Sequence, residues 1–325
     1  MVAPVPGLLC PGPGIGRSTG LALRPIRPQR GPGRTALVSC LIGILWILGA
    51  CGGAEEESSA TDSVAHQGSV QQLIDDAGRS WDLDRPPERI VSLVPSATGI
   101  LIALGMRDRL VARTDFDRDE ALAGLPSVGG GLNPSLERLL GVRPELVIRF
   151  EGPSDRATPE TLDNLGVVHL AVRPDTIGDI QRIIGLLAAA VGEPERGAEL
   201  QRELAADLEA VRRSVQGLPP PRVAFLLGGD PPWVAASGTF LDELLTIAGG
   251  ENVFGDEGPL YAPMSVEEII RREPDFLLLT EGSRIPGSLD RLPVRRVPES
   301  VQSPGVEVGR SAASLARILH PEAFR

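Results

Sequence analysis

Four aromatic residues lie at or just beyond the ends of predicted strands, in segments rich in Gly, Pro and Asp. They are Phe116, Phe150, Trp233 and Tyr261, the only Tyr of the chain. Ligands of open α/β sheets bind beyond the carboxyl ends of the strands, so aromatic side chains there are suited to a large, flat or apolar ligand. The alternative is that each ring packs beneath its own loop. The residue pattern alone leaves both interpretations open.

Catalytic motifs are missing from the sequence. It contains no Gly-x-Ser-x-Gly elbow, no phosphate-binding Gly-x4-Gly-Lys loop and no His-Glu-x-x-His segment. Every basic residue is Arg, so lysine Schiff-base chemistry is excluded. The glycine clusters at 129–131 and 228–229 lack the dinucleotide-binding spacing, and the carboxylates of 267–268 begin a predicted helix, where the helix dipole favours them. We therefore expect a protein that is not an enzyme.

Charge and cysteine usage restrict the function further. After Cys51 the chain holds 43 acidic residues against 27 Arg, and this net charge of −16 disfavours nucleic acid as a partner. All three Cys lie within the first 51 residues, while His66, His169 and His320 are far apart in sequence. We expect neither a disulfide within the body nor a metal site made by the protein, and no resident cofactor.

The first fifty residues have the layout of an export signal. Several Arg precede the uncharged, mostly apolar run Thr35–Ala50, which at 16 residues is short for a membrane-spanning helix. The sequence Leu-Gly-Ala-Cys at 48–51 resembles the bacterial lipobox, which implies cleavage before Cys51 and lipidation of that residue. An uncleaved anchor helix is the alternative, and either arrangement holds the body at a membrane, outside the cytoplasm. Residues 2–32 suggest a disordered extension or a start codon placed too far upstream.

The rest of the sequence predicts two α/β lobes. Residues 51–69 are small and polar and are expected to form a flexible tether. Short apolar strands alternate with helical patterns in 70–193 and again in 217–325, which predicts a mainly parallel sheet in each lobe. Between them, 194–216 is rich in Ala, Glu, Leu and Arg and is followed by three Pro. This segment predicts a single long α-helix of about 33 Å that bridges the lobes.

Five short motifs lie in order along this body. They are RIVSLVPSAT at 89–98, NPSLE at 133–137, RPELVI at 143–148, GGENVF at 249–254 and HPE at 320–322. Together they resemble the substrate-binding proteins of cobalamin and ferric-siderophore ABC importers, and the resemblance covers roughly Val70 to the C-terminus. It implies two α/β lobes joined by a long backbone helix, with the ligand held between the lobes.

The resemblance also implies roles for individual residues. The pocket aromatics of cobalamin-binding members fall at Phe116, Phe150, Trp233 and Tyr261. Glu137 and Glu267, one in each lobe, match glutamates that meet Arg on a membrane permease. If the resemblance is not considered, each is better interpreted as an ordinary solvent-exposed helix residue. The resemblance thus implies a monomeric, lipid-anchored protein that captures cobalamin or a related corrinoid and delivers it to an ABC importer permease.

Because the sequence departs from the family pattern at three points, the identity of the ligand is not decided by the resemblance. Gly99 stands where many relatives have Glu, Val306-Glu307 replaces a frequent Pro-Arg, and a Trp expected near Gly130 is missing. Glu307 disfavours an anionic ligand group at that point. A ferric siderophore or haem is therefore the alternative small-molecule metal chelate. An exported sensor or enzyme on the same scaffold is the alternative from a different class.

Overall fold

The computed structural model describes residues 71–152, 157–256, 258, 260–285 and 287–324. The expected signal segment, the lipidation residue Cys51 and the tether lie outside these residues. No helix in the described part is both long and apolar enough to cross a membrane.

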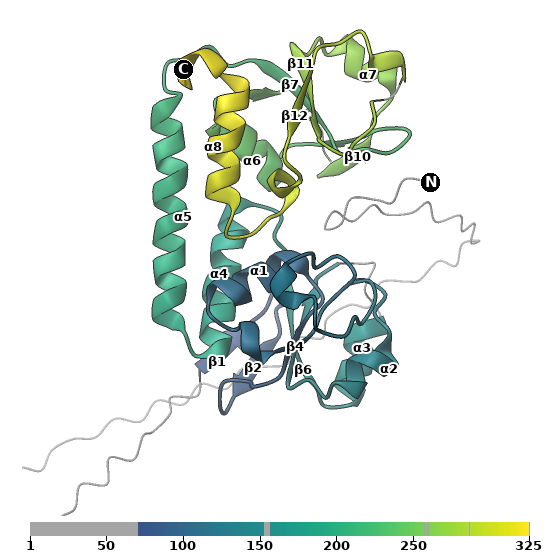
Figure 1. The fold of residues 1–325 in the computed structure, drawn as a ribbon, viewed down its shortest axis with the longest axis vertical. Coiled ribbons are helices and arrows are strands. Elements are labelled where there is room, and N and C mark those ends of the chain that lie inside the picture. Colours follow the sequence, from purple (N-terminus) through teal and green to yellow (C-terminus); the bar gives the residue numbers. More distant parts are fainter. Residues whose placement is uncertain (1–70, 153–156, 257, 259, 286, 325) are drawn as a thin grey trace, which may run out of the picture. The chain divides into compact units, whose positions relative to one another are not determined.

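The first lobe, in the lower half of Figure 1, is built on a parallel sheet of order β4-β3-β5-β6. Its strands are β3 (Ile90–Ser92), β4 (Leu110–Ala112), β5 (Leu146–Phe150) and β6 (Val168–Val172). Its helical segments are α1 (Pro95–Ala103), η1 (Arg107–Arg109), η2 (Glu120–Leu122), α2 (Leu136–Gly141), α3 (Ala157–Asn164) and α4 (Ile177–Val191).

Alternate residues of these strands point into two different cores. Ile148 of β5 packs in the core that includes Ile184 of α4, whereas the preceding Val147 packs with Leu139 of α2 and Leu162 of α3. Side chains on a strand alternate between the faces of the sheet, so helices must cover both faces. The predicted parallel sheet is confirmed, and its strands end at a common edge.

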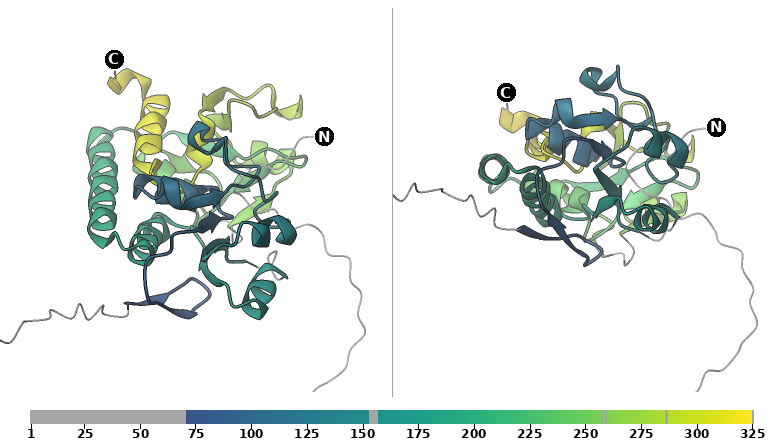
Figure 2. Two further views of the ribbon diagram at one scale, coloured as in Figure 1. Left: turned by 60° about the horizontal axis from the view of Figure 1, so that its bottom comes forward. Right: turned by 90° about the horizontal axis from the view of Figure 1, so that it is seen from below.

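An antiparallel hairpin precedes this sheet. It consists of β1 (Gln71–Ile74) and β2 (Ser80–Leu83), and Figure 2 shows it at the periphery of the first lobe. Its turn is attached to β6: the Asp76 amide donates to the Ala171 carbonyl at 3.0 Å, and the Ala171 amide donates to the Asp75 carboxylate at 3.1 Å.

The start of α1 differs from the expectation. The sequence favoured a helix over Gly99–Leu104, capped by Ser96 or Thr98. The helix instead begins at Pro95, and Ser96 and Thr98 are buried inside it, where the Thr98 hydroxyl donates to the Val94 carbonyl at 3.3 Å. Proline is favoured at the first helical position because its fixed φ suits a helix and its missing N–H has no partner there.

The second lobe contains a mixed sheet of order β10-β8-β7-β11-β12, with β9 paired with β7. Its strands are β7 (Arg222–Leu226), β8 (Trp233–Ala235), β9 (Glu251–Asn252), β10 (Tyr261–Pro263), β11 (Phe276–Thr280) and β12 (Val294–Val297). Its helical segments are α6 (Phe240–Ile247), α7 (Val266–Arg271), η3 (Gly287–Leu289), η4 (Glu299–Gln302), α8 (Val308–Leu319) and η5 (Pro321–Phe324).

The two short strands β8 and β10 run antiparallel to their neighbours, whereas the other pairings in this sheet are parallel. The sequence placed Trp233 and Tyr261 at or just beyond strand ends, in loops. Each lies at a strand end, but as the first residue of one of these short strands. Three-residue strands next to Gly and Pro are too short to show an alternating pattern.

Helix α5 (Pro194–Ser214) joins the lobes. Its buried residues Leu200, Leu204, Leu208 and Val211 form one stripe, and the helix packs along α4 of the first lobe and α8 of the second (Figure 1). At 1.5 Å per residue its length is about 32 Å. The predicted two-lobe α/β architecture with a bridging helix is confirmed.

One helix–strand unit occurs in both lobes. Ser135 caps α2 by accepting from the Arg138 amide, and Ser265 caps α7 by accepting from the Glu268 amide at 3.1 Å. After each helix the chain passes through a residue with positive φ that precedes Pro, Arg143 (46°) in the first lobe and Glu273 (49°) in the second. In the described part of the chain these are the only two non-glycine residues with positive φ.

An arginine at the start of a neighbouring strand closes each unit: Arg89 directly precedes β3, and Arg222 is the first residue of β7. The Arg89 guanidinium donates to the carbonyls of Val142 and Arg143 at 2.6–3.2 Å, beyond the end of α2. Arg222 donates to the carbonyls of Arg272 and Glu273 at 2.9 and 3.5 Å, beyond the end of α7. Carbonyls at a helix C-terminus lack intrahelical partners, so a cation there stabilises the helix end.

Candidate functional site

The two glutamates expected to dock on a permease are free and exposed. Glu137 is the second residue of α2 and Glu267 the second of α7. Within the described residues neither carboxylate takes part in a hydrogen bond or ion pair. Glu268, the neighbour of Glu267, is instead engaged with Arg271 and with Arg272, the latter at 2.8 Å. Of the two consecutive carboxylates of α7, only Glu267 is available to a partner.

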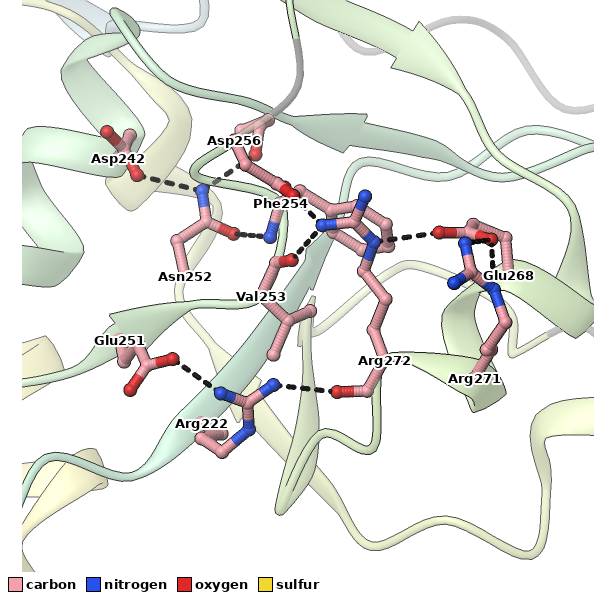
Figure 3. Close-up of polar contacts among 11 residues, drawn as sticks. Arg222, Asp242, Glu251, Asn252, Val253, Phe254, Asp256, Glu268, Arg271 and Arg272 are labelled. Atoms are coloured by element: carbon pink, nitrogen blue, oxygen red, sulfur yellow. Dashed lines mark hydrogen bonds and ion pairs between the residues drawn. The ribbon is translucent and has the colours of Figure 1, made fainter.

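Arg272 anchors α7, the helix that carries Glu267 (Figure 3). Its Nη1 donates to the Val253 carbonyl at 2.6 Å and also pairs with Asp256, and its Nε donates to Glu268. Its guanidinium lies over the ring of the fully buried Phe254, 5.0 Å from the centroid. The family motif at 249–254 thus fixes the helix behind Glu267.

The amide of Asn252, in the same motif, connects three elements. Its Nδ2 donates to the Ala235 carbonyl of β8 and to the Asp242 carboxylate of α6, both at 2.9 Å, and its Oδ1 accepts from the Phe254 amide at 3.1 Å (Figure 3). Asn252 therefore holds β8 in place, and β8 begins with Trp233, a candidate ligand-binding residue.

His320, in the last motif, and Gly131, just before the NPSLE motif, also have structural roles. His320 lies 3.1 Å from the Gly249 carbonyl through its Nε2, so the 249–254 and 320–322 motifs meet in the fold. Gly131 packs directly on the backbone of Leu93, where an added Cβ would lie 2.1 Å from the carbonyl oxygen. Gly131 therefore serves close backbone packing in this lobe.

Trp233 and Tyr261 share one face of the second sheet. In the antiparallel pair β8–β10, Trp233 lies opposite Pro263 and Ala235 opposite Tyr261. Directly opposed residues, and residues two apart on one strand, point to the same face, so Trp233 and Tyr261 are diagonal neighbours. Both side chains are half-buried against the core that contains Ala235.

The phenol of Tyr261 is held in its neutral form. Burial raises its pKa above the usual 10, and the negative charge of Asp175, in the loop between β6 and α4, raises this pKa further. The neutral hydroxyl offers a hydrogen-bond donor and an acceptor.

Two hydrogen bonds join the lobes near this point. The Phe240 amide donates to the Asp175 carbonyl at 2.5 Å, and the Ile177 amide at the start of α4 donates to the Glu243 carboxylate of α6 at 2.7 Å. Neither Asp175 nor Glu243 was predicted as a functional residue from the sequence. They lie far from their partners along the chain, and no local pattern signals such a contact.

Phe150 lies beside the same loop, on the first-lobe side. It is the last residue of β5 and pairs with Val172, the last residue of β6, three positions before Asp175. Phe150, Trp233 and Tyr261 are half-buried and pack against one hydrophobic core. Phe116 differs, since it is 39% exposed in the segment after β4 and is not among the side chains packed on that core.

Comparison with known proteins agrees with this architecture. The sequence profile of a family described as periplasmic binding protein matches residues 90–293. The chain therefore belongs to the periplasmic binding protein family. It is a solute-binding protein that acts outside the cytoplasm, and not an enzyme.

Particular relatives refine the comparison. The vitamin B12-binding protein of Vibrio vulnificus (strain CMCP6) is 29% identical over 196 residues, which span 60% of this chain and 72% of that protein. The periplasmic haem-binding protein RhuT of Roseiflexus sp. RS-1, in its apo form, is 30% identical, with a TM-score of 0.64 over 73% of this chain and 99% of its own. The vitamin B12-binding protein BtuF of Vibrio cholerae, 24% identical, has the same fold, with a TM-score of 0.63 over 74% of this chain and 99% of its own.

Proposed function

We propose that the chain binds cobalamin or a related corrinoid between its two lobes and delivers it to an ABC importer permease. The observation that carries the proposal is the placement of Phe150 in the first lobe and of Trp233 and Tyr261 in the second. All three are half-buried against one hydrophobic core. Phe150 pairs with Val172, after which the chain enters the loop of Asp175, whose carbonyl accepts from Phe240 of the second lobe. Aromatic faces presented from two lobes supply a large apolar contact for a flat chelate.

Haem is the second candidate ligand. It is favoured by the 30% identity to a haem-binding protein over almost the full length of that chain. Cobalamin is favoured by the named function of the Vibrio vulnificus relative. Both ligands are flat metal macrocycles, so the same aromatic arrangement suits either. On both hypotheses the chelate is cargo, and the protein holds no cofactor of its own.

Tryptophan fluorescence tests the ligand directly. After Cys51 the chain has only two Trp, Trp81 in the hairpin and Trp233. A W81F variant of the secreted body therefore makes Trp233 the sole reporter. Titration with cyanocobalamin, haemin and a ferric hydroxamate is expected to quench Trp233 saturably with one macrocycle, and a W233F variant that keeps Trp81 corrects for absorption by the chelate. A lack of response to cyanocobalamin would contradict the corrinoid proposal, and a response to haemin alone would select the second candidate.

Delivery requires attachment to the membrane and docking on the permease. We propose lipidation of Cys51 as the attachment, and Glu137 and Glu267 as the docking residues. The two free carboxylates, one on each lobe, can each accept a bidentate bond from a permease Arg. A C51A variant is expected to leave the membrane fraction, or to remain unprocessed, and to lose incorporation of labelled palmitate. Unchanged labelling would contradict lipidation at Cys51.

A further inference from the structure

Two glycines lie against the rings of proposed ligand-binding aromatics, one in each lobe. A Cβ added to Gly152 would lie 2.6 Å from Cε1 and 3.1 Å from Cδ1 of Phe150. A Cβ added to Gly229 would lie 2.9 Å from Cδ1 of Trp233. Carbon atoms in contact are normally about 3.5–4.0 Å apart, so each ring occupies space that only glycine leaves free.

At Gly152 the clash between an added side chain and the aromatic ring can be tested without backbone strain. Gly229 has a φ of 96°, so any side chain there is also strained by the backbone. Gly152 is not among the residues with positive φ, and the Phe150 ring is the obstacle to a methyl group there. Gly130 offers the matched comparison, because its Cβ would lie at an ordinary 3.8 Å from the Phe116 ring.

The ring has little freedom to retreat. Phe150 packs against a core whose buried members include Ile148 and Val172, next to it in the sheet. Protein cores are close-packed, so a ring displaced by about 1 Å moves more easily toward solvent than into the core. For Phe150 the solvent side is the end of the strand, where we place the ligand.

We propose that Gly152 is a positioning residue for ligand binding: by lacking a side chain it lets the Phe150 ring lie close to the backbone and out of the space between the lobes. Gly229 has the same relation to Trp233 in the other lobe. This inference rests on the proposed function, because it takes the aromatic rings as ligand contacts.

The test is a double-mutant cycle with G152A and F150A, using cyanocobalamin and haemin as probes. G152A is expected to weaken binding of the chelate that the wild type binds by at least tenfold, and G130A to leave it unchanged. In the F150A background the further change G152A is expected to have no effect, because the ring it displaces is gone. Equal affinity of G152A and wild type, or the same loss with and without Phe150, would overturn the proposal.

A second readout needs no ligand. In protein labelled with 4-fluorophenylalanine, the resonance removed by F150L identifies Phe150. This resonance is expected to shift in G152A and to stay in place in G130A, and an unshifted resonance in G152A would overturn the proposal. If the wild type binds neither chelate, the proposed function fails, and the fluorine resonance alone then decides whether Gly152 positions the ring.

Discussion

Glu137 and Glu267 occupy the same position in two copies of one local structure. Each is the second residue of a six-residue helix capped by a Ser hydroxyl, and the chain leaves each helix through a positive-φ residue before Pro. Both carboxylates are exposed, and neither has a partner within the described residues. A charged side chain kept unpaired at equivalent points of two lobes is well placed to bind a partner that contacts both lobes.

Replacing both residues by Arg tests this role. The double variant E137R/E267R is expected to lower chelate uptake in cells at least tenfold, because it opposes like charges at both contacts, while the affinity for the chelate in solution stays within twofold. Uptake of labelled chelate and calorimetry of the purified variant measure the two quantities.

Glu195 supplies the matched control. It is also an exposed second residue of a helix without a partner among the described contacts, but it lies on the bridging helix α5. E195R is expected to retain full uptake. Equal uptake by E137R/E267R and E195R would show that these glutamates do not dock.

Arg89 and Arg222 are expected to stabilise the two repeated units independently of ligand. Truncation of either to Ala removes hydrogen bonds to two carbonyls beyond a helix end and should lower the free energy of unfolding by about 1–2 kcal/mol. Urea denaturation measures this. R310A is the control, because Arg310 is 80% exposed and pairs only with Glu307, so its loss should cost less than about 0.5 kcal/mol. If R89A and R222A lower the free energy of unfolding no more than R310A does, the role assigned to Arg89 and Arg222 is contradicted.

Tyr261 can be observed alone, because it is the only Tyr of the chain. Burial raises the pKa of its phenol, so the folded protein should show little tyrosinate absorbance at 295 nm at pH 10, whereas the urea-unfolded chain should be half ionised there. The unfolded phenol loses its proton first, so the stability that this group contributes is complete below about pH 10 and is lost at higher pH. Half-ionisation of the native protein at pH 10 would mean that Tyr261 is open to solvent.

His169 should make stability depend on pH in the acidic range. It is fully buried, accepts from Arg149 Nε at 3.2 Å through Nδ1, and has Nε2 3.1 Å from the Asp163 carboxylate. Burial lowers the pKa of its imidazole. The hydrogen bond to Asp163 acts in the opposite direction, and the positive charges of Arg149 and Arg79 lower this pKa further. The unfolded state, with a pKa near 6.5, binds the proton first, so stability is full above about pH 6.5 and falls below it.

The variant H169Q is expected to flatten this dependence. The difference in unfolding free energy between pH 7.5 and pH 5.5 should be smaller in H169Q than in the wild type. An unchanged difference in H169Q would assign the dependence to other groups.

Periodic segments of the fold were predictable from the sequence. The apolar runs at 146–150 and 222–226 and the stripe on α5 show their period locally, so these elements and the bridging helix were found. The strands of Trp233 and Tyr261 were not, because their pairing and shared face arise from contacts between segments that are not local in sequence. The lobe contacts of Asp175 and Glu243 were missed for the same reason.

The family motifs identified the class without revealing what their residues do. Asn252 and His320 hold strands and loops in place, and the neighbouring Phe254 lies buried under Arg272. These motif residues stabilise the fold, so they identify the fold and not the ligand. The ligand-binding role of the aromatics remains a prediction, with three of the four gathered on one core and Phe116 exposed.

In the proposed function, one flat metal chelate is held by aromatic rings from both lobes. This arrangement is tested by calorimetric titration of the wild type, F150A and W233A with cyanocobalamin and haemin. We predict one-to-one binding of one chelate by the wild type and by the hairpin control W81F. F150A and W233A should each weaken that binding at least tenfold, which corresponds to about 1.4 kcal/mol. Wild-type affinity in either F150A or W233A, or no binding of either chelate by the wild type, would contradict the claim.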